Sequence, residues 1–369
     1  MVFDSRLQSS PLEGYASHSL NRVFREEPST AIEIHSWMSD VCEEYKYPMG
    51  ELDHHVQCRS MGSSWSGNSL KYLKVSPKRR GFQESRKTIV LFGGLDGSNW
   101  LSVSALLWFF KLIVSHHPVA RQLRNNYMFV IMPVANPDGF DYSHRMKDQN
   151  WLKNFCPPEK RERQTVERCP ADTNLNYNFE SEFSYFQNAS SLDQNSQYYA
   201  GTYANSAREV RDISSALKNM DAEGAGLMVL NVIGTGKLWT IPYGSGRRDH
   251  RYADSFRVAT GAIEGIHNSR RNRGLWRAGN TNDIEGAPRT GSLEDFVAGN
   301  TEIPYSFNVA LAPGSRGVKW GTTFDDRESA MDLLLAINGA IRTDKANQFS
   351  DRNQWGHTVD ARARSWSFF

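Results

Sequence analysis

The heptapeptide Gly94-Leu95-Asp96-Gly97-Ser98-Asn99-Trp100 lies between a predicted strand and a predicted helix, and this junction decides the fold. The apolar run Thr88–Phe92 precedes it and has the length and composition of a buried strand. The apolar stretch 101–114 follows it and is long enough for a buried helix. Open α/β sheets bind ligands outside the carboxyl ends of their strands, so Asp96 and Asn99 are predicted to face such a site.

The rest of the chain alternates strands and helices around this junction. Further strands are predicted at residues 56–61, 70–75, 127–133, 226–232, 274–277 and 305–311, and helices at 30–44, 206–220 and 327–341, with another after His117. The pattern predicts an α/β protein, a single domain whose mixed, mostly parallel twisted sheet of about eight strands has helices on both faces. We place this domain at residues 29–343, between an N-terminal extension (1–28) and a polar C-terminal tail (344–369).

The charges of the chain nearly cancel, with 43 basic and 41 acidic side chains among 369 residues. No field of the whole chain therefore favours nucleic acid or a membrane surface, and we expect a monomer without a nucleic-acid partner. No run reaches the ~18 uninterrupted apolar residues of a membrane span, because Lys111 interrupts the most apolar helical stretch, 105–114. Residues 1–14 lack the apolar core of a signal peptide, so the chain is mature, truncated or not exported.

Six further motifs follow the heptapeptide in order. They are the segment from Met132 to Phe140, Trp151-Leu152-Lys153-Asn154, the segment from Asn174 to Phe179, Tyr199-Ala200-Gly201, Pro242-Tyr243-Gly244 and Tyr305-Ser306-Phe307. Together with the heptapeptide they resemble the zinc metallocarboxypeptidases of the A/B type, whose first motif reads Gly-x-His-x-x-Glu-Trp. The resemblance covers roughly residues 29–343 and implies the fold of that family. An unrelated α/β protein with chance motifs is the competing interpretation.

The zinc ligands of that family correspond to Asp96, Asn99 and Ile233 in this chain. In the family these positions hold a His, a Glu and a second His. Asn99 offers a neutral oxygen and Ile233 no ligand atom, whereas a catalytic zinc site uses three protein ligands and a water. The resemblance therefore predicts a degenerate metal site and no zinc cofactor. All ten histidines lie outside these positions.

Other catalytic positions of the family are also replaced. The general base falls at Ala310, and the arginine that stabilises the transition state falls at Leu152. The Asn-Arg pair that binds the substrate's terminal carboxylate reads Asn176 and Tyr177, and the tyrosine of that site falls near Ala287. Because zinc creates the nucleophile by lowering the pKa of its bound water to about 7, we expect no catalytic residues in this chain.

These losses predict a catalytically inactive family member that binds a peptide or protein in a remodelled cleft. Its role would be that of a regulator, decoy or scaffold. By analogy with inactive fungal relatives, that role could be linked to the cell wall or the extracellular space. Ligand contacts are expected from Asn176, Tyr177, Tyr243, Glu294 and Asp295.

The cleft is also expected to have lost positive charge. Four positions where the family has arginine are neutral here: Ser98, Leu152, Tyr177 and Ala312. A free carboxylate would lose its solvation in such a cleft without gaining a partner, so an internal segment or a neutral side chain is the expected ligand. Two alternatives stay open: a cleft that filled in after the metal was lost, and a zinc-dependent peptidase-type hydrolase with an altered metal site.

Four cysteines allow two disulfides. Secreted family members have a disulfide in the loop before the position of Asn174, which makes Cys156–Cys169 one possible pair and Cys42–Cys58 the other. A glycosylation sequon, Asn188-Ala189-Ser190, lies in a polar loop. These features favour the extracellular space or the secretory pathway.

Overall fold

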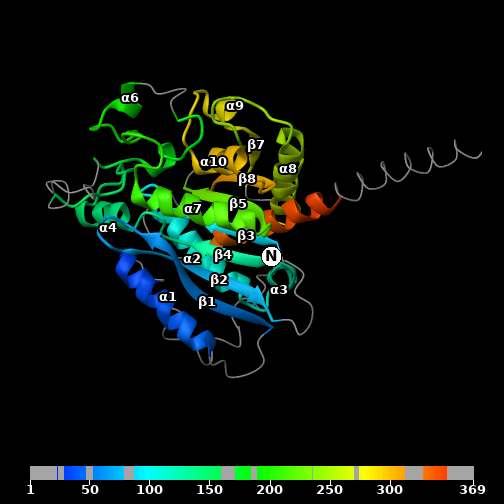
Figure 1. Ribbon diagram of the computed structural model, residues 1–369. Coiled ribbons are helices and arrows are strands. Elements are labelled where there is room, and N and C mark those ends of the chain that lie inside the picture. The colour runs from blue at the N-terminus through cyan, green and yellow to red at the C-terminus, as the bar shows by residue number, and fades with distance from the viewer. Residues whose placement is uncertain are drawn as a thin grey trace, which may run out of the picture.

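A mixed eight-stranded sheet lies at the centre of the protein, with helices on both sides (Figure 1). The computed structural model describes residues 23, 29–46, 53–78, 87–158, 171–183, 189–234, 236–269, 274–311 and 327–346. The sheet with its covering helices confirms the predicted α/β fold of a single domain. The proposed division at residues 28 and 343 stays a prediction.

The strand order across the sheet is β1-β2-β4-β3-β5-β8-β6-β7. In chain order the strands are β1 (His54–Ser63), β2 (Ser69–Pro77), β3 (Thr88–Phe92), β4 (Met128–Met132), β5 (Gly226–Ile233), β6 (Leu238–Ile241), β7 (Arg277–Asn280) and β8 (Tyr305–Ala310). The central strands β4, β3, β5 and β8 are parallel, whereas β1–β2, β2–β4 and β6–β8 are antiparallel pairs. The carboxyl ends of β3, β5 and β8 therefore meet at one edge, where open α/β sheets bind ligands.

Helices cover the two faces of the sheet with separate cores. The helical segments are α1 (Ala31–Lys46), α2 (Trp100–Ile113), α3 (Pro118–Asn126), α4 (Pro137–Met146), η2 (Leu175–Tyr177), α6 (Ala189–Leu192), α7 (Arg208–Ala222), α8 (Tyr252–Ser269), α9 (Thr281–Glu285), α10 (Leu293–Asn300) and a last helix over residues 327–346. Side chains of α1, α2, α3, α8 and the last helix share one core with Ile89 and Leu91 of β3. Side chains of α7 and α10 share the other with Val90 and Phe92, the alternate residues of the same strand. None of the described helices is long and apolar enough to cross a membrane alone; α2 and α3 meet that criterion only as a pair, bent by 87°.

Several elements differ from their predictions. The helices α4, α8, α9 and α10 and the strand β6 were not predicted. The strand β6 has only four residues, too few to show a period. The predicted strand at 274–277 is β7, displaced to Arg277–Asn280. The last helix continues beyond residue 341 to 346, and its buried Asp344 accepts a hydrogen bond from Tyr305 Oη at 2.8 Å. Asp344 therefore belongs structurally to the packed domain.

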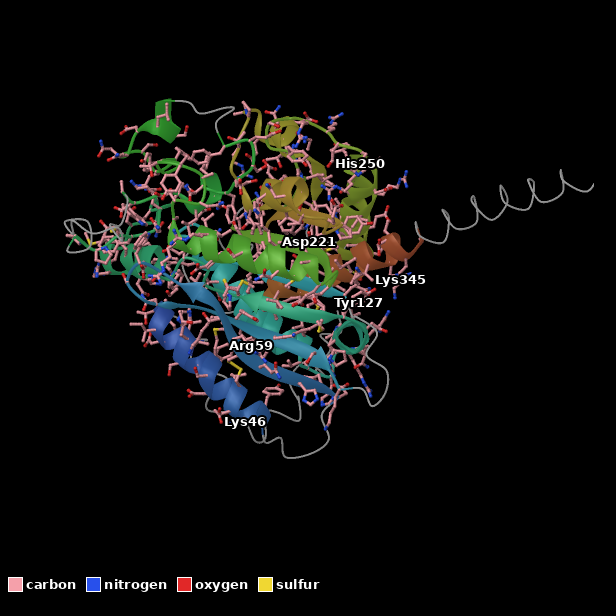
Figure 2. The ribbon with its side chains drawn as sticks, viewed as in Figure 1. Lys46, Arg59, Tyr127, Asp221, His250 and Lys345 are labelled. Carbon is pink, nitrogen blue, oxygen red and sulfur yellow. A yellow bond between two sulfur atoms is a disulfide. The ribbon has the colours of Figure 1, made fainter. Side chains whose placement is uncertain are left out.

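A disulfide connects the first helix to the edge of the sheet. Cys42 of α1 and Cys58 of β1 are bonded, with their Cα atoms 5.9 Å apart. Figure 2 labels Lys46, which ends the same helix, and Arg59, which follows Cys58 in the same strand. Cys156 is also disulfide-bonded, while its expected partner Cys169 and the sequon at Asn188 lie outside the described residues. Of the two pairs that the sequence left possible, Cys42–Cys58 is thus present as a disulfide.

Candidate functional site

Asp96 and Asn99 lie together in the turn that connects β3 to α2. The backbone N–H of Asn99 donates to the carbonyl of Asp96 at 3.0 Å. Oδ1 of Asn99 accepts from the backbone N–H of Ser102 at 3.4 Å and so caps the first turn of α2. The one oxygen that Asn99 could offer to a metal is therefore engaged in holding the helix.

A chain of side-chain amides connects this turn to the neighbouring strands. Nδ2 of Asn176, in η2, donates to Oδ1 of Asp96 at 2.7 Å. Nδ2 of Asn231, in β5, donates to Oδ1 of Asn176 at 3.0 Å and to Oε2 of Glu294, in α10, at 3.3 Å. The structure thus brings together three residues that the sequence singled out, and adds Asn231, which it did not.

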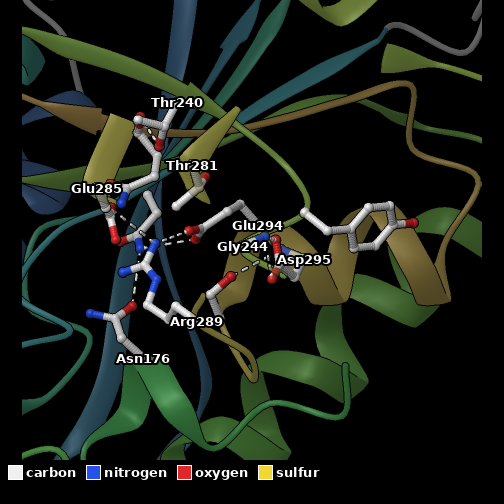
Figure 3. A network of polar contacts seen from close by, with 12 residues as sticks. Asn176, Thr240, Gly244, Thr281, Glu285, Arg289, Glu294 and Asp295 are labelled. Carbon is white, nitrogen blue, oxygen red and sulfur yellow. Dashed lines mark hydrogen bonds and ion pairs between the residues drawn. The ribbon is translucent and has the colours of Figure 1, made fainter. Parts of the chain in front are cut away.

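An arginine that was not predicted lies at the centre of this network (Figure 3). Nη2 of Arg289 donates to Oε1 of Glu294 at 2.6 Å and lies 3.8 Å from Oε1 of Glu285. The Arg289 side chain is only 12% exposed, and its Nε has no hydrogen-bond partner among the described residues. The expectation of a cleft without positive charge is therefore wrong, although two carboxylates balance the guanidinium.

Asp295 follows Glu294 in α10, and Tyr243 precedes Gly244, the glycine that contacts Asp295. The Asp295 carboxyl is fully buried and accepts from one donor, the backbone N–H of Gly244, at 3.1 and 3.0 Å to its two oxygens. The Tyr243 ring is buried, with the Arg247 guanidinium 3.8 Å from its centre and its hydroxyl 3.4 Å from Asp249. Glu294, Asp295 and Tyr243, all expected to contact a ligand, are thus engaged inside the protein.

Burial changes the acidity of the carboxyl groups in this region. It raises the pKa of Asp96 to about 6, against the opposing effects of the Asn176 hydrogen bond and of Arg289. Burial, followed by the charge of Glu294, raises the pKa of Asp295 to about 8. The pKa of Glu285 is raised by burial as well, with Arg289 acting against it. Asp96 and Asp295 consequently release their protons at a higher pH than ordinary surface carboxyls, which release theirs below pH 5.

The remaining predicted positions lie in several elements. Ile233 and Ala310 are paired residues at the ends of β5 and β8, and Gly234 follows next to Oδ1 of Asn99. The half-buried Tyr177 makes an edge contact with the exposed Tyr198, with ring centres 5.9 Å apart. The other two positions are farther along: the backbone N–H of Leu152 donates to Gln197, and Ala312 lies outside the described residues.

The sequence profile of the zinc carboxypeptidases matches residues 35–331 of this chain. The chain belongs to the zinc carboxypeptidase family. Bovine carboxypeptidase B2 is 29% identical over 310 residues, which are 83% of this chain and 64% of that protein. A zinc carboxypeptidase of Simulium vittatum is 25% identical over 77% of this chain and 85% of its own. The crystal structure of thrombin-activatable fibrinolysis inhibitor has the same fold, with a TM-score of 0.72 at 24% identity over 92% of this chain and 79% of that one.

The chain spans just under two thirds of the length of several carboxypeptidase B2 relatives. Family membership confirms the resemblance found in the sequence motifs. It confirms the fold, in which the carboxyl ends of β3, β5 and β8 meet at one edge of the sheet. Activity, substrates and partners of this chain have to be inferred from its own residues.

The family's zinc does not fit the residues that this chain presents. Asp96 is the one strong ligand of the three positions, and it already accepts a hydrogen bond from Asn176. Asn99 caps α2, and the side chain of Ile233 has no donor atom. Over the described residues, the structure contains no group of three or more His, Cys, Asp or Glu side chains placed to hold a metal ion. No catalytic step can therefore be derived through zinc.

Two residues of this network, Asn231 and Arg289, were not identified from the sequence, for different reasons. Asn231 is one polar residue in an otherwise apolar run, which predicts a buried strand but gives no partner for the amide. Arg289 lies in a segment where alignment to the family is loose. Its spacing from two acidic residues, four after Glu285 and five before Glu294, was the available signal.

Proposed function

We propose that this chain is a non-catalytic member of the zinc carboxypeptidase family, and that it binds a peptide or protein segment at its remodelled cleft. One observation supports this most directly: the three ligand positions hold a carboxylate, a helix-capping amide and an aliphatic side chain. Without the metal, no group here would generate a hydroxide at neutral pH. The general-base position is Ala310, which has no proton acceptor.

The ligand we propose is an internal segment of a peptide or protein. Nδ2 of Asn176 donates to Asp96 and Nη2 of Arg289 donates to Glu294, so a terminal carboxylate would compete with carboxylates of the protein for both side chains. A carboxylate that entered would lose its hydration and meet the carboxyl groups of Asp96 and Glu285. The paired rings of Tyr177 and Tyr198 offer aromatic contacts to a neutral segment instead.

The proposed setting is the secretory pathway or the extracellular space. The Cys42–Cys58 disulfide supports it, since such bonds persist in oxidising compartments. There a non-catalytic family member would act as a regulator, decoy or scaffold by binding a peptide segment without cleaving it.

Paired peptide arrays test this proposal. Each sequence is presented with a free C-terminus, with an amidated C-terminus and as an internal segment of a cyclic peptide. We expect amidated and internal forms to bind at least about tenfold tighter than the free acid, because an unpaired carboxylate loses more than 1.4 kcal/mol. Tyr177→Ala is expected to weaken them, while the surface variant Phe256→Ala on α8 serves as the control.

Each outcome decides between the stated alternatives. Preference for free acids would contradict the proposed ligand, and release of C-terminal residues would establish the active hydrolase with an altered metal site. Binding of none of the forms would mean that the cleft has filled in. The mutational control separates cleft binding from adsorption to the exposed aromatic side chains elsewhere.

A further inference from the structure

Two successive carboxyl groups at the start of α10 share a single buried cation. Glu294 and Asp295 are 1% and 0% exposed, and Arg289 is the guanidinium that faces them. The same guanidinium also lies near Glu285, which is one third exposed. Three carboxyl groups therefore compete for one positive charge, and two of them are shielded from water. Charge balance in such a place requires at least one of them to keep its proton.

Hydrogen bonding identifies which carboxyl keeps it. Glu294 accepts from Nη2 of Arg289 at 2.6 Å and from Nδ2 of Asn231 at 3.3 Å. Among the described residues, Asp295 accepts from the N–H of Gly244 and from no charged donor. Asp295 therefore has the least to offset a negative charge and is the group that keeps its proton.

The same glycine connects Asp295 to the segment between α9 and α10. While its N–H donates to Asp295, the carbonyl of Gly244 accepts from the backbone N–H of Arg289 at 2.9 Å. Gly291 donates to the Ser181 carbonyl and accepts from the N–H of Phe179, both at 2.9 Å. Backbone hydrogen bonds thus hold residues 286–292 at two points, Arg289 and Gly291. Gly291 lies directly beside Tyr177, and a side chain at this position would collide with the Tyr177 carbonyl.

We propose that Asp295 is a proton switch that controls whether residues 286–292 stay closed against the cleft. With its proton, the buried carboxyl is neutral and the segment is closed. Loss of the proton places a second negative charge beside Glu294, and an opened segment in which water reaches Asp295 then becomes favoured. The inference rests on the proposed function, because it describes how pH would regulate access to the Tyr177 side of the binding cleft.

The other charged and titratable groups around Asp295 do not neutralise it. Glu182 adds negative charge and is paired with Arg247 at 2.8 Å. Asp249 is paired with Arg251 at 3.3 Å, Asp283 of α9 with Arg248 at 2.6 Å, and Tyr243 is neutral with a raised pKa. On the opposite side, Asp96 is held by Asn176. Arg289 is consequently the cation that decides the state of Glu294 and Asp295.

The direction of the pH effect follows from the raised pKa of Asp295. The folded closed state has a pKa of about 8 at this carboxyl, whereas an exposed aspartate has about 3.9. Stability of the closed segment is therefore complete below about pH 4 and is lost as pH rises toward 8. Over that window the equilibrium constant for opening of residues 286–292 rises by up to about tenfold per pH unit, which is the limit for the release of one proton.

Hydrogen–deuterium exchange of the ligand-free protein tests the switch without depending on any binding partner. Protection factors of the amides in residues 286–292, corrected for intrinsic exchange, are measured at pH 5.5, 6.5 and 7.5. We expect them to fall by up to about tenfold per pH unit in the native protein, while amides of β5 change less. In Asp295→Asn, which cannot ionise, the slope should vanish.

The control is Glu209→Gln, which alters another fully buried carboxyl, on α7, whose pKa burial raises to about 7. It should leave the slope of residues 286–292 unchanged. Equal slopes for residues 286–292 and β5 in the native protein would overturn the proposal, even if Asp295→Asn failed to fold. A normal slope together with failed peptide binding would remove the proposed function and leave the switch in place.

Discussion

Replacing Arg289 by methionine is expected to destabilise the protein by about 3–5 kcal/mol at pH 7, the usual result of removing one partner from a buried ion pair. The guanidinium is the cation placed between Glu294 and Glu285, and Glu294 is 1% exposed. Without it, Glu294 would have to take up a proton or remain charged in a site that water does not reach. The free energy of unfolding, measured by urea denaturation of both proteins, gives the difference directly.

The size of this loss should depend on pH and on Glu294. At pH 5 the penalty is expected to shrink, since Glu294 can take up a proton there at a smaller cost than at pH 7. The double variant Arg289→Met/Glu294→Gln should recover most of the stability, because it removes the unpaired charge together with its partner. A loss below about 1 kcal/mol in Arg289→Met, typical of an exposed ion pair, would mean that this guanidinium is not the counterion of the buried site.

The sequence predicted the β3–α2 junction and the motif residues of the site better than the contacts between their side chains. The junction from β3 to α2 was predicted from an apolar run of strand length, a polar turn and a second apolar run of helix length. Asp96, Asn99 and Asn176 could be placed because they lie within motifs of fixed spacing. Local pattern and motif order carry this kind of information.

The partners of those residues could not be predicted from the sequence. Asn231 bonds to Asn176 across 55 positions, and Arg289 contacts Glu294 from the loop between α9 and α10, which has no helical or strand period. Helix α10 itself begins with a polar turn, where Ser292 caps Asp295, and an isolated eight-residue segment of this kind gives a weak helical period. The charge balance of the cleft was therefore misjudged, and α9 and α10, which flank Arg289, were not predicted.

Restoring the three ligands should restore a metal site. The triple variant Asp96→His/Asn99→Glu/Ile233→His is expected to raise bound zinc from below about 0.1 to about one atom per chain, since three protein ligands suffice for a catalytic zinc. Asp96 and Asn99 lie in one turn, and Gly234, next to Ile233, already lies against the Asn99 side chain. Elemental analysis after dialysis against zinc and removal of free metal provides the measurement.

The matched control keeps Ile233 and changes only the other two positions. This double variant should bind zinc more weakly than the triple variant, because it lacks the ligand from the end of β5. Equal zinc content in the double and triple variants would show that Ile233 does not lie at the metal position. No zinc in either would place the three residues too far apart to share an ion.

The zinc content of the unaltered protein is the most direct test of the inactive cleft. Purified protein is equilibrated with excess zinc, freed of unbound metal and analysed beside Asp96→Ala. Because Asn99 caps α2, Ile233 has no ligand atom and Asp96 alone cannot hold a catalytic ion, we expect less than about 0.1 zinc per chain in both proteins. About one zinc per chain in the unaltered protein, lost in Asp96→Ala, would contradict the non-catalytic cleft.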